Sequence, residues 1–159
     1  MQQFPLGPSI SQVRGVLKVL NENKGAMTVA KLAEEINEQI DSLLPLLHAC
    51  ELLGMIKVKN GEVSLTDIGN VYDEKSFMES ARNGMQNIEP FKTVIDALDK
   101  HELTTHELAK ALRKRGVSFH ADGITNEEIL KSLLIGWGIR IGMLHYDSKK
   151  DLWRAEPIR

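Results

Sequence analysis

The chain of 159 residues is long enough for one medium-sized domain or two small ones, and its hydrophobic fraction of 42% excludes a disordered protein. The formal net charge of −2 shows no basic surplus of the kind that nucleic-acid-binding domains usually carry. The single cysteine, the lack of an apolar run of ~20 residues and the lack of a basic, apolar leader predict a soluble, cytoplasmic protein without membrane insertion.

The chain is predicted to begin with two helices after a short irregular segment. Residues 1–8 contain two prolines and a glycine and are predicted to be an irregular N-terminus. Ser9 or Ser11 begins a helix whose apolar residues recur at helical spacing. Thr28 begins a second helix, in which an apolar face lies opposite a charged one.

The third predicted helix is apolar almost all round. The dipeptide Asp41-Ser42 begins it, and Pro45 falls in or next to its first turn, where proline costs least. Alternating apolar residues on both sides of Asn60-Gly61 then predict a β-hairpin. Thr66 is predicted to begin a further short helix that includes residues 71–72.

The same order of elements is predicted a second time in residues 89–159. Thr104 or Thr105 begins the second helix of this copy, and Thr125 with Glu128 forms a capping box at the start of its third helix. A hairpin with its tip at residues 147–151 follows.

The sequence therefore predicts a mainly α-helical, α+β chain with small β-hairpins. We interpret it as two tandem winged-helix (helix-turn-helix) domains, residues 9–73 and residues 89–159. A linker helix over residues 74–88 is predicted to join them.

Motifs for catalysis or cofactor binding are missing from the sequence. It has no phosphate-binding Gly-Lys-Ser/Thr, no Gly-x-Ser-x-Gly and no His-Glu-x-x-His. His120 and Asp122 offer two metal-type ligands, whereas a structural site typically needs about four. His48 and Cys50 lack an orienting partner, and we expect His48 to be buried and hydrogen-bonded. The prediction is a non-enzymatic protein with no catalytic residues, no cofactor and no metal.

DNA contact has two basic clusters as its support. Residues 1–80 hold seven Lys and Arg against eleven Asp and Glu, and residues 81–159 hold thirteen against eleven. The third predicted helix of the first copy has no Lys or Arg, although base contacts depend largely on such side chains. One basic cluster, residues 113–115, is at the end of a predicted helix, and the other, residues 149–150, is at the tip of a predicted hairpin. Either the first complements the helix dipole and the second is a solvent-exposed tip, or both contact phosphates. The candidate DNA contacts are Arg113, Lys114, Arg115, Lys149 and Lys150.

Protein contact fits the leucine-rich third helix better. A helix that is apolar on every side has more hydrophobic surface than one small core can use. The candidate interface residues are Leu43, Leu46 and Leu47. They either bury within the chain or contact a second copy or another protein.

The same helix carries a family resemblance. Residues 41–54 (DSLLPLLHACELLG) and 63–69 (VSLTDIG) resemble the AAA-associated C-terminal domain. That domain follows the ATPase domain in some nitrate/sulfonate/taurine-type ABC transporter ATP-binding proteins. The resemblance covers residues 9–155, and no ATPase motif accompanies it here.

What the resemblance implies is a cytoplasmic regulatory or accessory module without catalytic residues. Its expected partner is the ATPase subunit of an ABC transporter, or a second copy of the chain through self-association. The leading hypothesis is therefore a non-enzymatic protein that acts through protein–protein contacts. The alternative is a winged-helix transcriptional regulator that binds DNA.

Overall fold

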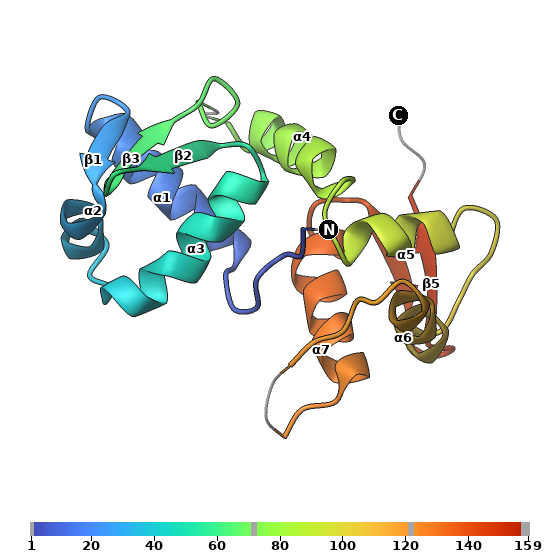
Figure 1. Ribbon diagram of the computed structural model, residues 1–159. Coiled ribbons are helices and arrows are strands. Elements are labelled where there is room, and N and C mark those ends of the chain that lie inside the picture. The colour runs from blue at the N-terminus through green and yellow to red at the C-terminus, as the bar shows by residue number, and fades with distance from the viewer. Residues whose placement is uncertain (1, 71–72, 121–122, 157–159) are drawn as a thin grey trace. The chain divides into compact units, whose positions relative to one another are not determined.

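The computed structural model describes residues 2–70, 73–120 and 123–156 (Figure 1). Helices alternate with two small antiparallel sheets, so the α+β prediction is confirmed. The chain divides into two compact units. The N-terminal unit is Phe4–Gly84, and the C-terminal unit is Met85–Arg159 together with Met1–Gln3. In the part of the chain that the structure describes, no helix has the length and apolar character needed to cross a membrane.

The N-terminal unit combines helices with a three-stranded sheet. Its elements are α1 (Ile10–Glu22), β1 (Ala26–Thr28), α2 (Val29–Glu35), α3 (Ile40–Leu52), β2 (Ile56–Lys59), β3 (Glu62–Leu65) and α4 (Glu74–Met85). The strand order is β1-β3-β2, and Val63 of β3 lies between Met27 and Val58. Helices α1 and α3 pack on each other and on this sheet (Figure 1). The sequence missed β1, because Thr28 is both the last residue of this short strand and the N-cap of α2.

Helix α3 begins earlier than predicted. Its first residue is Ile40, and the N-cap Gln39 makes no side-chain capping hydrogen bond. Pro45 therefore lies in the second turn rather than the first. A proline at this position cannot donate to the carbonyl of Asp41, so α3 lacks one hydrogen bond near its start.

The prediction of a helix after Thr66 is wrong for residues 66–70, which form a turn. The other residues predicted in this helix include residues 71–72, which lie outside the described residues. Thr66 donates its hydroxyl to the carbonyl of Gly54 and its backbone N–H to the carbonyl of Met55. A Cβ on Gly69 would lie 1.8 Å from that Met55 carbonyl oxygen. These contacts hold the backbone against the end of α3, and a helix there would break them.

The helix predicted as a linker packs on the N-terminal unit. Phe77 and Ala81 of α4 are buried, and the Arg14 guanidinium lies 5.6 Å from the centre of the Phe77 ring. A Cβ on Gly84 would lie 3.2 Å from backbone atoms of Leu53 at the end of α3. Residues 74–84 thus complete this unit.

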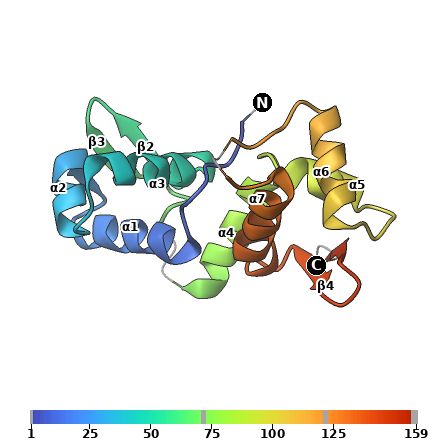
Figure 2. The same cartoon turned by 90° about the horizontal axis from the view of Figure 1, so that it is seen from below.

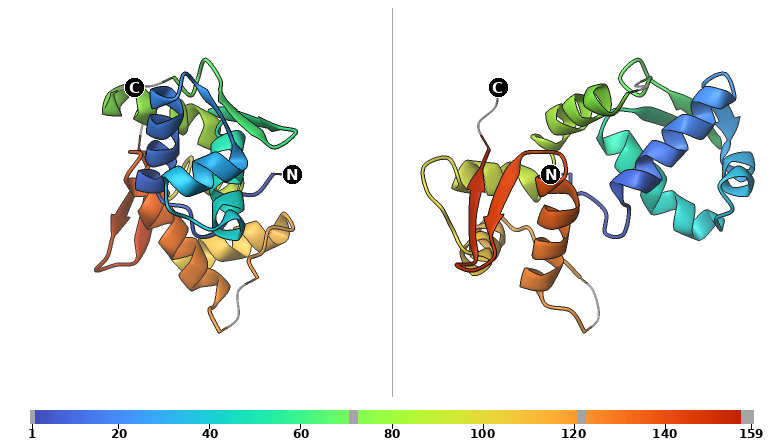
Figure 3. Two further views of the ribbon diagram at one scale, coloured as in Figure 1. Left: turned by 90° about the vertical axis from the view of Figure 1, so that its left-hand side faces the viewer. Right: turned by 180° about the vertical axis from the view of Figure 1, so that it is seen from behind.

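The described residues of the C-terminal unit form four helical segments and a hairpin. They are α5 (Phe91–Ala97), α6 (Thr105–Lys114), α7 (Asn126–Leu133), the π-helix η1 (Leu134–Ile139), β4 (Leu144–Asp147) and β5 (Leu152–Ala155). Helix α6 packs against both α5 and α7 (Figure 2). Strands β4 and β5 form the antiparallel hairpin drawn in red in Figure 3. An isolated bridge between Leu103 and Trp153 adds a residue that lies two positions before the start of α6 to this hairpin.

Capping at the starts of two helices confirms the sequence pattern. The Thr104 hydroxyl accepts from the Glu107 backbone N–H, and the Glu107 carboxylate accepts from the Thr104 backbone N–H. Thr125 and Glu128 make the same reciprocal pair at the start of α7. These local hydrogen bonds fix where both helices begin.

Candidate protein-contact surface

The three leucines predicted as an interface lie in the core. Leu43, Leu46 and Leu47 of α3 are buried, so an external partner cannot reach them in this structure. They are candidate interface residues on the condition that they lie at the surface, and this condition is not met. Of the alternatives that the sequence left open, the structure shows burial within the chain.

The opposite face of α3 is exposed and partly apolar. Ile40 is 49% exposed and Leu44 is 52% exposed. These residues are four positions apart, so their side chains are neighbours on one helix face. Pro45 and His48 extend this exposed face. We call the pair Ile40 and Leu44 the outward ridge of α3.

The spacing of polar residues in α3 is a sequence signal from which the exposure of Leu44 could have been predicted. Asp41 and His48 are exposed, and Leu44 lies three residues after the first and four before the second. Residues with these spacings share one face of a helix. Asp41, a charged residue that is expected to face solvent, therefore indicated that Leu44 faces outward as well. Ile40 was missed because the predicted helix began one residue after it.

Exposed carboxylates lie close to the outward ridge in the chain. The sequence has no Lys or Arg between Lys31 and Lys57. Four exposed acidic residues lie at the end of α2, in the connection to α3 and in the first turn of α3. We call them the acidic rim: Glu34, Glu35, Glu38 and Asp41. Because phosphates are repelled by such a rim, this face does not fit DNA.

The first candidate DNA cluster lies at the C-terminal end of α6. Arg113 and Lys114 are exposed in its last turn, where cations complement the helix dipole. Arg115 donates from Nη1 to Oδ2 of Asp96 at 3.0 Å and to Oγ1 of Thr93 at 3.3 Å. Arg115 therefore contacts α5, and a phosphate would compete with Asp96 for it.

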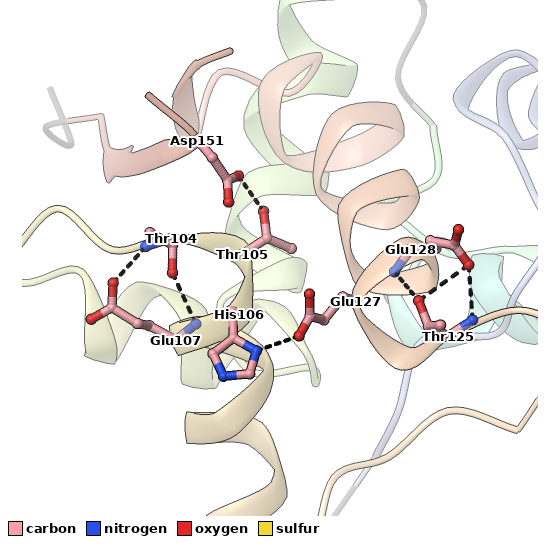
Figure 4. A network of polar contacts seen from close by, with 8 residues as sticks. All are labelled: Thr104, Thr105, His106, Glu107, Thr125, Glu127, Glu128 and Asp151. Carbon is pink, nitrogen blue, oxygen red and sulfur yellow. Dashed lines mark hydrogen bonds and ion pairs between the residues drawn. The ribbon is translucent and has the colours of Figure 1, made fainter. Parts of the chain in front are cut away.

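The second candidate cluster lies at the tip of the β4–β5 hairpin. Lys149 and Lys150 are exposed, and their backbone N–H groups donate to Oδ1 of Asp147. Next to them, the Thr105 hydroxyl donates to Oδ1 of Asp151 at 2.8 Å, as Figure 4 shows. The hairpin tip thus lies beside the first residue of α6.

The structure does not bring the two basic clusters together. Thr105 begins α6 and Lys114 ends it, so these two positions are about 13 Å apart along the helix axis at 1.5 Å per residue. Figure 4 also shows the His106 ring next to Glu127, in the acidic first turn of α7. The predicted recognition helix of this unit therefore presents carboxylates where a DNA-reading helix presents donors to the groove.

Hydrogen bonds fix the hairpin tip to α6. The Trp153 indole Nε1 donates to the Thr105 hydroxyl at 2.9 Å, and the Tyr146 hydroxyl donates to Oδ1 of Asp151 at 2.8 Å. Burial alone raises the pKa of Asp151, but the hydrogen bonds from Thr105 and Tyr146 outweigh it and hold that pKa below its usual value. The network is a structural one, because each of its polar groups has a partner within the unit.

The residues considered for catalysis or metal binding lie apart. Cys50 is buried, and this burial raises the pKa of its thiol to about 12. His48 is exposed, which corrects the prediction that it is buried, since residues two apart on a helix point to opposite sides. His120 is exposed, and Asp122 lies outside the described residues. Among the described residues, no three His, Cys, Asp or Glu side chains form a group that could hold a metal ion.

Comparison with protein families gives a match over most of the chain. A family model described as the C-terminal AAA-associated domain matches residues 30–147. The match runs from α2 to β4, so it spans both units and includes the outward ridge of α3. No curated protein and no solved structure gives a match.

Proposed function

Because the chain belongs to the family of C-terminal AAA-associated domains, we propose that it is a non-enzymatic regulatory or accessory protein. It serves an ABC-type transporter of the nitrate/sulfonate/taurine-like kind. It acts in the cytoplasm through protein–protein contacts. The family links it to ABC-transporter-associated proteins. The outward ridge of α3 is the surface through which it binds, and the ATPase subunit of the transporter is its partner.

The observation that carries this proposal is the pairing of Ile40 and Leu44. Single exposed apolar residues are common on protein surfaces and need no explanation. Here two large aliphatic side chains lie one helical turn apart, each about half exposed, with Pro45 beside them. Covering them with a partner would remove apolar surface from water at about 25 cal/mol per Å².

The order of elements supports tandem winged-helix units as the architecture behind this surface. In the N-terminal unit the order is helix, strand, helix, helix, strand, strand. The C-terminal unit repeats it, with the Leu103 bridge in place of the first strand. In a DNA-binding winged helix the third helix would enter the major groove. We propose that α3 in this position contacts a protein instead, because its exposed face carries aliphatic and acidic side chains.

The proposal is tested by a pull-down from lysate of the native organism, with and without nuclease. The test variant is Ile40→Gln/Leu44→Gln, because glutamine removes the apolar surface and still favours a helix. The control is Ile124→Gln, which replaces an isoleucine that is 53% exposed in the C-terminal unit.

The wild-type chain and the control are expected to recover an ABC ATPase subunit regardless of nuclease. The Ile40→Gln/Leu44→Gln variant is expected to lose it while keeping the circular dichroism spectrum of the wild type. Undiminished recovery by the double variant would show that the outward ridge is not the binding surface. Recovery only of nuclease-sensitive complexes would favour the DNA-binding alternative.

A further inference from the structure

We infer that the segment which docks on the outward ridge of α3 is a basic amphipathic helix of the partner protein. Its apolar side chains contact Ile40 and Leu44, and its Lys or Arg side chains pair with the acidic rim. This inference rests on the proposed function and adds the chemistry of the partner to it.

The shape of the ridge favours a helical partner. Ile40 and Leu44 form a short row along α3, with Pro45 and His48 continuing the exposed face. Rows of side chains four residues apart pack well into the grooves between the rows of another helix. A helix that presents apolar residues at positions i, i+3 or i+4 and i+7 matches such a row.

The charge around the ridge determines the polar residues of the partner. Asp41 follows Ile40 directly, Glu38 precedes it by two residues, and α2, which ends in Glu34 and Glu35, packs against α3. Within the described part of the chain, none of the ion pairs involves a carboxylate of the acidic rim. The four carboxylates are therefore available to pair with cations at the edge of the partner's apolar stripe. Residues 32–56 contain no Lys or Arg that would compete for these carboxylates.

The same charge argues against other occupants of this face. Nucleic acids and anionic lipid surfaces both present phosphates, which the acidic rim repels. A second copy of this chain would place one acidic rim against another if the contact were symmetric. A cationic protein helix is the occupant that satisfies both the apolar ridge and its rim.

The experiment selects binders from a phage-displayed library of random peptides of about 16 residues, roughly four helical turns. The library is panned separately on the full chain, on Ile40→Gln/Leu44→Gln and on the control Ile124→Gln. The enriched peptides are then synthesised, and their binding is measured by fluorescence anisotropy. The second test variant is Glu38→Gln/Asp41→Asn, which keeps the shape of both side chains and removes their charge.

The expected consensus has apolar residues at helical spacing and at least two Lys or Arg beside them. Enrichment is expected on the wild-type chain and on Ile124→Gln, and it is expected to disappear on Ile40→Gln/Leu44→Gln. Since exposed ion pairs are individually weak, Glu38→Gln/Asp41→Asn is expected to weaken peptide binding roughly 3- to 10-fold. The remaining affinity should depend less on salt than that of the wild type.

The possible failures are distinguishable. Peptides that need Ile40 and Leu44 but carry no basic residues, or that bind Glu38→Gln/Asp41→Asn equally well, would overturn the basic-helix inference and leave the protein-contact function standing. A lack of any enrichment that depends on Ile40 and Leu44 would overturn the basic-helix inference, whereas the protein-contact function is overturned only if the pull-down recovers no ABC ATPase subunit.

Discussion

Leu43 and Leu44 are adjacent in α3, yet the Leu43 side chain is 0% exposed and the Leu44 side chain is 52% exposed. Successive residues of an α-helix are about 100° apart around its axis, so the two leucines belong to different faces. Leu43 packs in the core with Leu47, whereas Leu44 shares the outward ridge with Ile40. One leucine-rich helix thus contributes to stability through one face and offers apolar surface on the other.

Alanine substitution of these two neighbours is predicted to have very different effects on stability. Leu43→Ala leaves a cavity in the core and is expected to lower the free energy of unfolding by about 2–5 kcal/mol. Leu44→Ala removes exposed atoms and is expected to change it by less than about 0.5 kcal/mol. Urea unfolding followed by circular dichroism measures both. Equal losses in the two variants would contradict the burial difference.

Local hydrogen bonds made part of this fold predictable from sequence. Thr104 and Thr125 each precede a glutamate by three residues, and both capping boxes form within a single helical turn. The Asn60-Gly61 hairpin is equally local, since its register follows from the two residues at its tip. Such features depend on a few neighbouring residues and therefore appear in the sequence pattern.

Contacts between distant residues account for what the sequence did not predict. Thr66 follows β3 and enters a turn, because its hydroxyl donates to the carbonyl of Gly54, twelve residues earlier. In the same way, the packing of α1 on α3 decides which leucines of α3 are covered and leaves Leu44 exposed. The three candidate interface leucines therefore lie on the buried face of α3, and Leu44 lies on its exposed face.

The buried Thr105 hydroxyl is predicted to matter for both the hairpin and α6. Thr105→Ala leaves the buried indole N–H of Trp153 without its acceptor and Asp151 without one of its donors. Leaving a buried polar group unpaired costs about 1–3 kcal/mol. Urea unfolding followed by tryptophan fluorescence should show this loss. Thr105→Ser keeps the hydroxyl and should recover most of it, whereas equal losses in both variants would mean that packing of the methyl group is responsible.

Asp151 is predicted to give the C-terminal unit an acid-sensitive contribution to stability. Its folded pKa lies below the usual value, because the hydrogen bonds from Thr105 and Tyr146 outweigh the effect of burial. A carboxylate with a lowered pKa stabilises the folded state above its unfolded pKa of about 3.9, and this contribution is lost as the pH falls through the folded pKa. Asp151→Asn lacks it at every pH.

The free energy of unfolding of Asp151→Asn should accordingly be lower than that of the wild type by a constant amount from neutral pH to about pH 5. The difference should shrink below about pH 4, where the wild-type carboxylate becomes protonated. Urea titrations of both proteins across this range test the prediction. A difference that stays constant at the lowest pH would show that the charge of Asp151 is unimportant.

Two glycine-to-alanine substitutions are predicted to have opposite signs. A Cβ on Gly69 would lie 1.8 Å from the Met55 carbonyl oxygen, so Gly69→Ala must displace the turn from the end of α3 and lower stability by about 1–3 kcal/mol. Gly15 lies inside α1, where an added Cβ would meet no atom within 4 Å, and Gly15→Ala should raise stability by about 0.5–1 kcal/mol. Thermal unfolding of both variants provides the comparison. A neutral Gly69→Ala would contradict the close approach of the turn to Met55.

The separation of the two basic clusters predicts weak and unspecific DNA binding. Lys149 and Lys150 lie at a hairpin tip beside the start of α6, whereas Arg113 and Lys114 lie at its other end. With a formal net charge of −2, the chain is expected to bind a DNA duplex with a Kd no tighter than roughly 10⁻⁴ M at physiological salt. Fluorescence anisotropy with a labelled duplex measures this, with Lys149→Glu/Lys150→Glu as the comparison. A much tighter complex that weakens steeply with salt, and that the double substitution abolishes, would instead establish the hairpin tip as a phosphate-binding wing.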